Sequence, residues 1–123
     1  MFDSTLRQPI TGLHILGELH TKETSPLRDI SFVKDKIVEI VAQAGLNQVG
    51  VAEYVFPEGG YTFVILLAES HISIHTWPEL GYITLDVFVC NVSRDNSAVS
   101  RTLFDSIVQL FSLVRVNTRE VIR

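Results

Sequence analysis

The chain has 123 residues, of which 46% are hydrophobic, and its 10 basic against 14 acidic residues give a net charge of −4. This composition excludes a disordered chain, and the scattered lysine and arginine residues argue against nucleic-acid binding. A single cysteine excludes an internal disulfide, and no stretch approaches the roughly 20 apolar residues of a membrane span. Because the first ten residues also lack the apolar run of a signal peptide, we expect one cytoplasmic domain covering 1–123, with no membrane partner.

Hydrophobic periodicity predicts eight regular elements. In chain order they are a strand at 12–20, a helix at 30–45, strands at 47–56, 61–68, 70–77 and 82–90, a helix at 98–111 and a strand at 112–123. Asp29 or Ser31 is expected to cap the first helix and Gly45 to end it. The order β-α-β-β-β-β-α-β favours an α+β fold, a two-layer sandwich with an antiparallel-rich sheet and both helices on one face. The other face is also rich in apolar and aromatic residues, so we expect a second subunit to cover it.

The segment 68–90, AESHISIHTWPELGYITLDVFVC, combines an acid, a serine, two histidines and the only cysteine on an apolar background. As strand residues four apart, His71 and His75 would share a face at a separation of roughly 13 Å, too far to bind one metal ion. No metal site is therefore expected.

Two other interpretations of this segment stay open on residue types alone. A hydrolase could use Ser70 with His75 and Glu69, Glu79 or Asp86, but the Gly-x-Ser-x-Gly motif is absent. An ideal strand would also point residues five apart to opposite faces. The plainer interpretation makes these polar residues ordinary members of a strand and Cys90 a small buried residue, and residue types alone favour it.

The complete string supports a more specific interpretation. It resembles the processing segment of the prokaryotic S-adenosylmethionine decarboxylases, with Glu-Ser-His-x-x-x-His-Thr-Trp-Pro-Glu, then Gly-Tyr, then an Asp-Val-Phe strand that ends in Cys. Every one of these positions is filled between residues 69 and 90. The resemblance is firm for 61–90, and elsewhere it concerns length and element order.

This resemblance implies that the chain makes its own cofactor. The Ser70 hydroxyl would attack the Glu69 carbonyl, and the chain would separate into a β chain (1–69) and an α chain (70–123). The α chain would begin with a pyruvoyl group derived from Ser70, which forms a Schiff base with S-adenosylmethionine and serves as the electron sink for decarboxylation. The product is the aminopropyl donor for spermidine synthesis. A rigid sheet would hold the Glu69–Ser70 amide in a strained position.

The resemblance also implies roles for five further features. His75 matches the histidine that assists proton removal during self-cleavage, and Thr62 takes the place of a hydroxyl that supports it. Cys90 matches the cysteine that returns a proton to the substrate carbon. Glu79 matches the acid that binds the ribose hydroxyls, and Phe56 the aromatic residue that stacks on adenine. A homodimer is expected by the same analogy.

The sequence departs from the family near the expected pocket. ELHTKE (18–23) replaces a Tyr-Gly-Cys-like stretch, Tyr54 a common histidine and Phe63 a small residue. One alternative is therefore a pyruvoyl-dependent decarboxylase of ornithine or arginine. The retained Phe56 and Glu79 argue against it, because a small amino acid has no adenine or ribose.

A second alternative is an uncleaved paralogue that serves as a binding or regulatory partner. Its basis is the bulk of Thr62 and Phe63, which would misalign the attack of Ser70 on the preceding carbonyl.

Overall fold

The computed structural model describes residues 10–92 and 94–123. The strands are β1 (Gly12–Thr21), β2 (Gln48–Val55), β3 (Tyr61–Leu67), β4 (Ser70–Trp77), β5 (Tyr82–Cys90) and β6 (Leu113–Ile122). The helices are α1 (Ile30–Gln43) and α2 (Ser97–Val108), with short 3-10 helices η1 (Ser25–Arg28) and η2 (Pro78–Leu80). Every predicted strand and helix is present, in the predicted order.

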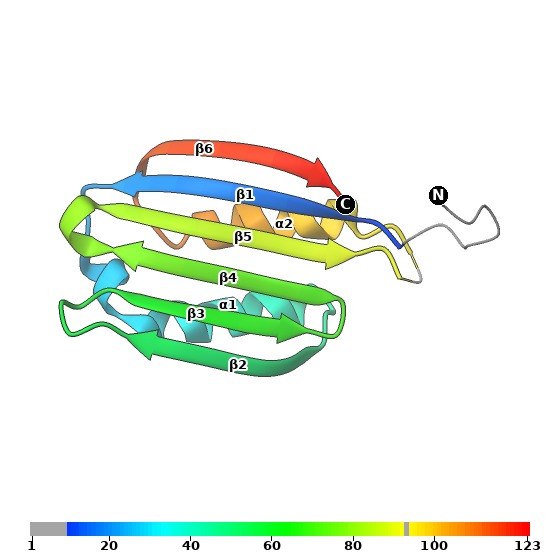
Figure 1. Ribbon diagram of the computed structural model, residues 1–123, viewed down its shortest axis with the longest axis horizontal. Helices are drawn as coiled ribbons and strands as arrows, with labels where there is room; N and C mark the ends of the chain where they lie inside the picture. The colour runs from blue at the N-terminus through cyan, green and yellow to red at the C-terminus, as the bar shows by residue number, and fades with distance from the viewer. Residues whose placement is uncertain (1–9, 93) are drawn as a thin grey trace, which may run out of the picture.

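All six strands form one antiparallel sheet in the order β2-β3-β4-β5-β1-β6. Figure 1 shows both helices behind the same face, with α1 behind the β2–β4 half and α2 behind β5 and β1. Among the described residues, no helix covers the opposite face. The predicted α+β two-layer fold is confirmed.

The core lies between the sheet and the helices, and the alternation of the strands builds it. In β5 the even and odd positions separate cleanly. The buried side chains of this strand are Ile83, Leu85, Val87 and Val89. The helices contribute Val33, Ile37 and Val41 from α1 and Leu103, Phe104 and Ile107 from α2. Because these apolar side chains pack between the sheet and the helices, the other face of each strand is turned away from the core.

The helix ends follow local chemistry. Asp29 caps α1 by accepting a hydrogen bond from the Phe32 amide at 3.1 Å, and Gly45 follows the helix with a φ of +75°, both as predicted. The second helix ends at Val108, three residues before the predicted boundary. There the Phe111 amide bonds to the Val108 carbonyl, the i→i+3 pattern of a tighter turn. In the described part of the chain, no helix combines the length and apolar character needed to cross a membrane.

Candidate active site

The sheet face turned away from α1 and α2, called the open face below, carries most of the polar side chains of interest. In β4 the residues under the helices are Ile72, Ile74 and Thr76, and those on the open face are His71, Ser73, His75 and Trp77. His71 and His75 thus share a face four residues apart, as predicted. Within the described residues, no group of three or more His, Cys, Asp or Glu side chains is arranged to hold a metal ion.

Ser70 begins β4 directly after the two-residue turn Ala68–Glu69, where Leu67 of β3 pairs with Ser70. Its φ is +155°, and it is the only non-glycine residue with a positive φ among those the structure describes. Backbone in this region costs of order 1–3 kcal/mol unless glycine occupies it. The Glu69–Ser70 peptide bond therefore lies beside a strained residue.

The carbonyl oxygen of Glu69 accepts a hydrogen bond from the backbone N–H of Cys90 at 2.8 Å. The Glu69 carboxylate accepts two longer bonds, from the amide and the side chain of Asn47, each at 3.4 Å. The turn is therefore held from both sides. A fixed N–H donor on the carbonyl oxygen would also stabilise the negative charge that a nucleophile creates there.

Cys90 ends β5 with a partly exposed thiol on the open face. Its carbonyl oxygen accepts a hydrogen bond from the Asn96 side chain at 2.8 Å. Gly12 of β1 pairs with Cys90, and a Cβ at this glycine would come within 2.8 Å of the Cys90 Cα. The close approach of β1 to β5 therefore requires glycine at position 12. This approach holds the Cys90 backbone beside the Glu69–Ser70 bond.

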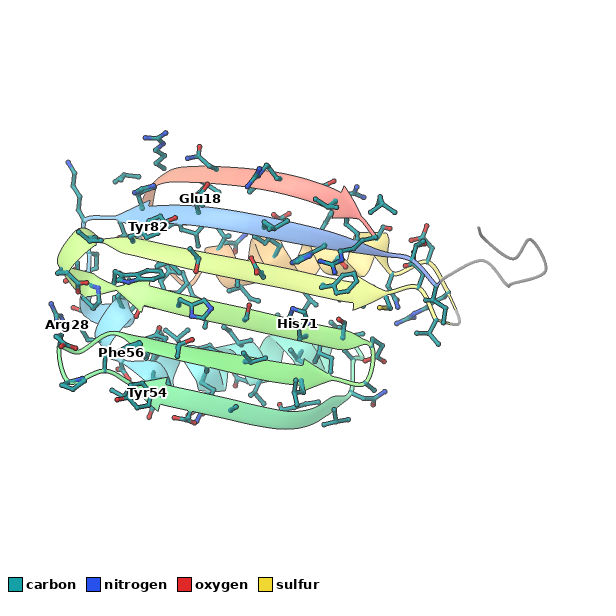
Figure 2. The ribbon with its side chains drawn as sticks, viewed as in Figure 1. Glu18, Arg28, Tyr54, Phe56, His71 and Tyr82 are labelled. Atoms are coloured by element: carbon teal, nitrogen blue, oxygen red, sulfur yellow. The ribbon has the colours of Figure 1, made fainter. Side chains whose placement is uncertain are left out.

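His71 is the imidazole nearest the Ser70 hydroxyl in this chain. Its Nδ1 lies 3.3 Å from Ser70 Oγ, and its ring meets the rings of Phe88 and His14 edge-on, with centroids 5.9 and 6.1 Å away. Figure 2 shows it at the end of the sheet opposite Phe56. The sequence pattern suggested no role for His71 other than that of a metal ligand, although its position next to the serine was a usable signal.

His14 of β1 lies across Phe88 of β5 from His71 and is buried, and its Nε2 atom has no hydrogen-bond partner. Burial lowers the pKa of His14, Asp86 at 3.9 Å acts to raise it, and the nearby Arg123 and His71 lower it further. The neutral imidazole is therefore favoured in the folded chain.

Thr62 and His75 meet directly across β3 and β4. The Thr62 Oγ1 and His75 Nδ1 atoms are 2.5 Å apart, and the two residues are paired in the sheet register. Next along the strand, the Trp77 ring lies 6.3 Å from the His75 ring. The two residues predicted to support processing are thus brought together.

Phe56 and Glu79, the predicted adenine and ribose ligands, line one pocket of about 200 Å³ together with Trp77. The Tyr54 ring meets Phe56 edge-on at 5.0 Å, so the residue that replaces the family histidine stands beside the expected adenine site. Figure 2 places both aromatic side chains at the same end of the sheet.

The predicted site residues therefore form two separate groups. We call Glu69, Ser70, His71 and Cys90 the serine end, and Thr62, His75, Phe56 and Glu79 the histidine end. Ser70 and His75 are five residues apart, roughly 16 Å along a strand that rises about 3.3 Å per residue. A hydrolase that needs direct contact between Ser70 and His75 is consequently excluded within one chain.

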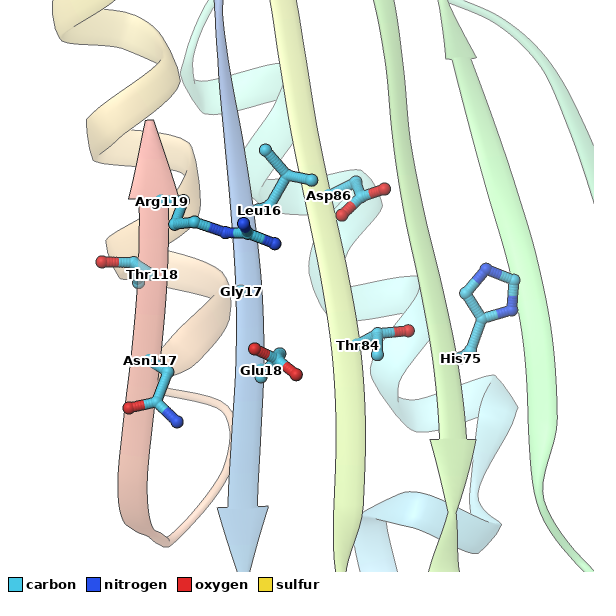
Figure 3. A pocket seen from close by; sticks show the side chains of 9 residues that line it. All are labelled: Leu16, Gly17, Glu18, His75, Thr84, Asp86, Asn117, Thr118 and Arg119. Atoms are coloured by element: carbon cyan, nitrogen blue, oxygen red, sulfur yellow. The ribbon is translucent and has the colours of Figure 1, made fainter. Parts of the chain in front are cut away.

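A pocket of about 540 Å³ lies in the middle of the open face and is lined in part by His75 of the histidine end. Figure 3 shows Glu18, His75, Asp86 and Arg119 around it, on four different strands. Tyr82 donates a hydrogen bond to Glu18 at 2.9 Å, and burial together with this bond raises the pKa of the Tyr82 hydroxyl. The floor of the open face is thus polar and charged at its centre.

Phe63, which replaces a small residue of the family, does not point to the open face. It is buried in the core, pairs with Ile74 and stacks on Tyr61 at 5.9 Å. Its bulk therefore lies under the helices and away from the Glu69–Ser70 bond.

A family model described as S-adenosylmethionine decarboxylase matches residues 13–123. The chain belongs to the S-adenosylmethionine decarboxylase family. An S-adenosylmethionine decarboxylase proenzyme of Archaeoglobus fulgidus is 39% identical over 92 residues, which are 75% of this chain and 80% of the relative. The predicted family and decarboxylase class are confirmed.

Two further relatives bear on the fold and the substrate. The crystal structure of adenosylmethionine decarboxylase from Aquifex aeolicus superimposes with a TM-score of 0.81 at 31% identity, covering 93% of this chain and 91% of that one. An arginine decarboxylase proenzyme of Hyperthermus butylicus is 40% identical over 88 residues, or 70% of this chain. The matched part is 62% of that relative's length.

Proposed function

We propose that this protein is a self-processing, pyruvoyl-dependent S-adenosylmethionine decarboxylase of the cytoplasm, with neither nucleic acid nor membrane as a partner. The observation that carries the proposal is the geometry of the Glu69–Ser70 bond. A strained serine follows a carbonyl whose oxygen already accepts an N–H bond from Cys90 at 2.8 Å. Family membership supplies the proenzyme chemistry that this geometry fits.

The bonds that form and break in self-cleavage lie at the serine end. Ser70 Oγ attacks the Glu69 carbonyl carbon, and the peptide bond becomes an ester. Elimination then breaks the Ser70 Cβ–Oγ bond, which releases chain 1–69 with the Glu69 carboxylate. Chain 70–123 takes up water and loses ammonia, so that Ser70 becomes the pyruvoyl group.

The pyruvoyl group would supply the electron sink that decarboxylation of the bound amino acid needs. The residues around Ser70 suit a pyruvoyl group, because the Cys90 thiol lies on the open face beside the chain end that cleavage would create. We assign to this thiol the proton that returns to the α-carbon after carbon dioxide leaves.

The histidine end holds the nucleoside part of the substrate in this proposal. The Phe56 ring offers a stacking surface for adenine, and the Glu79 carboxylate can accept hydrogen bonds from two ribose hydroxyls. The shared pocket of about 200 Å³ supports this assignment. Thr62 orients the His75 ring through the bond between their side chains.

The protein acts as a homodimer in this proposal, because one chain cannot bring its two ends together. Two open faces can pack about 10 Å apart, as sheets do in a sandwich. A two-fold axis in the plane between them and across the strands would place each serine end against the histidine end of the second chain. This arrangement would cover the exposed Tyr54, Leu66 and Trp77 and would build two sites.

A second candidate is an arginine decarboxylase of the same pyruvoyl type. The observations that favour it are the Hyperthermus butylicus relative and the presence of Tyr54 beside the expected adenine site. The processing chemistry is the same, and only the substrate differs.

Two measurements on the purified protein test these proposals. Intact mass under denaturing conditions is expected to show two fragments, with chain 70–123 lighter than its serine form by one ammonia. Release of labelled carbon dioxide from carboxyl-labelled S-adenosylmethionine, arginine and ornithine then identifies the substrate. A single chain of 13.8 kDa with no release would contradict both candidates and support the uncleaved paralogue.

A further inference from the structure

The hydroxyl of Ser70 lies close to the imidazole of the next residue, His71. Consecutive residues of a regular strand point to opposite faces, so their side chains do not normally meet. Here the φ of +155° at Ser70 departs from strand geometry, and Ser70 Oγ comes within 3.3 Å of His71 Nδ1. His75, roughly 16 Å away along the strand, cannot reach this hydroxyl in the same chain.

The surroundings of His71 hold its ring in this position. Phe88 and His14 stand edge-on to it, with centroids 5.9 and 6.1 Å away, and Phe88 is its partner in the β4–β5 register. A neutral imidazole that carries its proton on Nε2 leaves Nδ1 free to accept one from the serine. The ring is thus placed and oriented to act as a base on Ser70.

We propose that His71 is the base for the first step of self-cleavage. His71 Nδ1 takes the hydroxyl proton as Oγ bonds to the Glu69 carbonyl carbon. The Cys90 N–H stabilises the resulting oxyanion. The imidazolium then gives the same proton to the Ser70 nitrogen as the C–N bond breaks, so the step yields an ester and needs no other reactant.

The second step involves a different proton. A base must remove the Cα hydrogen of Ser70 while the Cβ–Oγ bond breaks and Glu69 leaves as a carboxylate. This is the proton removal that the family resemblance already gives to His75, which in the proposed dimer comes from the second chain. The inference rests on the proposed self-processing and divides it between two histidines, so each variant is expected to stop at a different intermediate.

Hydroxylamine distinguishes the two intermediates, because it cleaves an ester and leaves an amide intact. Freshly purified wild type, His71→Ala and His75→Ala are denatured with and without hydroxylamine and weighed. His20→Ala is the matched control, since His20 also lies on the open face but packs on Tyr82 at 5.1 Å, far from Ser70. His71→Gln is a second variant of closer size, and thermal melting shows that each protein is folded.

Wild type and His20→Ala are expected to be cut between residues 69 and 70 without hydroxylamine. We expect both His71 variants to be cut about 100-fold more slowly and to stay whole in hydroxylamine. His75→Ala is expected to be whole alone and cut by hydroxylamine. Folded His71 variants that match the wild-type rate, or that accumulate the ester, would overturn the inference alone. A wild-type chain that never cuts would overturn the proposed function as well.

Discussion

The two ends of the open face are built in different ways. At the serine end, backbone groups are fixed by other parts of the chain: Cys90 bonds to Glu69, and Asn96 bonds to Cys90. At the histidine end, side chains stand partly in solvent, with Phe56 42% and Trp77 37% exposed. The contrast fits the proposed roles, because the peptide bond proposed to break lies in a fixed backbone, whereas the proposed substrate pocket is open to a second surface.

Neither end alone carries all the groups that the proposed decarboxylation needs. The serine end has the bond whose cleavage we propose, a donor for its oxygen and a thiol, but it has no residue suited to adenine or ribose. The histidine end has the aromatic and acidic groups and no reactive bond. Variants that disable one end and spare the other therefore test the comparison directly.

The largest expected effect is that of Ser70→Ala, which removes the nucleophile from the serine end. The chain should stay whole, and decarboxylation should be abolished, because no pyruvoyl group can form. Intact mass and carbon dioxide release measure both. Ser73→Ala, three residues along the same strand and on the open face, should cut normally. A cut and active Ser70→Ala protein would refute the mechanism.

Cys90→Ala separates the two roles assigned to one residue. Self-cleavage should persist, because alanine retains the backbone N–H that bonds to the Glu69 carbonyl. Decarboxylation should fall about 100-fold, the usual contribution of a positioned proton donor. An uncut variant would show that the thiol itself is needed for processing, and an unimpaired rate would remove Cys90 from catalysis.

Phe56→Ala weakens the histidine end alone. Loss of a base-stacking surface costs roughly 1–3 kcal/mol, so KM for S-adenosylmethionine should rise about tenfold or more while cleavage stays complete. Val49→Ala, another exposed apolar residue of the β2 side, serves as the control and should leave KM unchanged. If KM for arginine rose instead and S-adenosylmethionine were not a substrate, the second candidate would be favoured.

The smallest effect concerns the pH dependence of folding. Because the pKa of His14 is lowered in the folded chain, the unfolded chain binds more protons below about pH 6.5, and stability is lost as the pH falls. Between pH 7 and pH 5, the melting temperature of the His14→Phe variant should fall less than that of its parent. The comparison is best made in the uncut Ser70→Ala background. Parallel curves for the two proteins would show that His14 does not contribute.

Much of the fold was predictable because the strands of this chain alternate so regularly. The turn at 78–81 also determines which residues of β4 and β5 are paired. Counting outward from it pairs Trp77 with Tyr82 and Ser70 with Val89, which places Cys90 beside Glu69. The sequence therefore held the signal for the bond between Cys90 and the Glu69 carbonyl, although the motif by itself does not encode it.

Other features depend on packing that no local pattern encodes. The position of β1 between β5 and β6 follows from long connections through the helices, so the strand order was not predicted. The positive φ of Ser70, and with it the contact to His71, arises where a two-residue turn meets a fixed register. The early end of α2 reflects a tightening of its last turn near Phe111.

The central claim, that each site joins the serine end of one chain to the histidine end of another, is tested most directly by complementation. Ser70→Ala and His75→Ala chains with different tags are coexpressed, and mixed pairs are isolated through both tags. The account predicts that the His75→Ala chain is cut in these pairs, because its Ser70 meets the intact His75 of its partner. Mixed pairs in which both chains stay whole would contradict it.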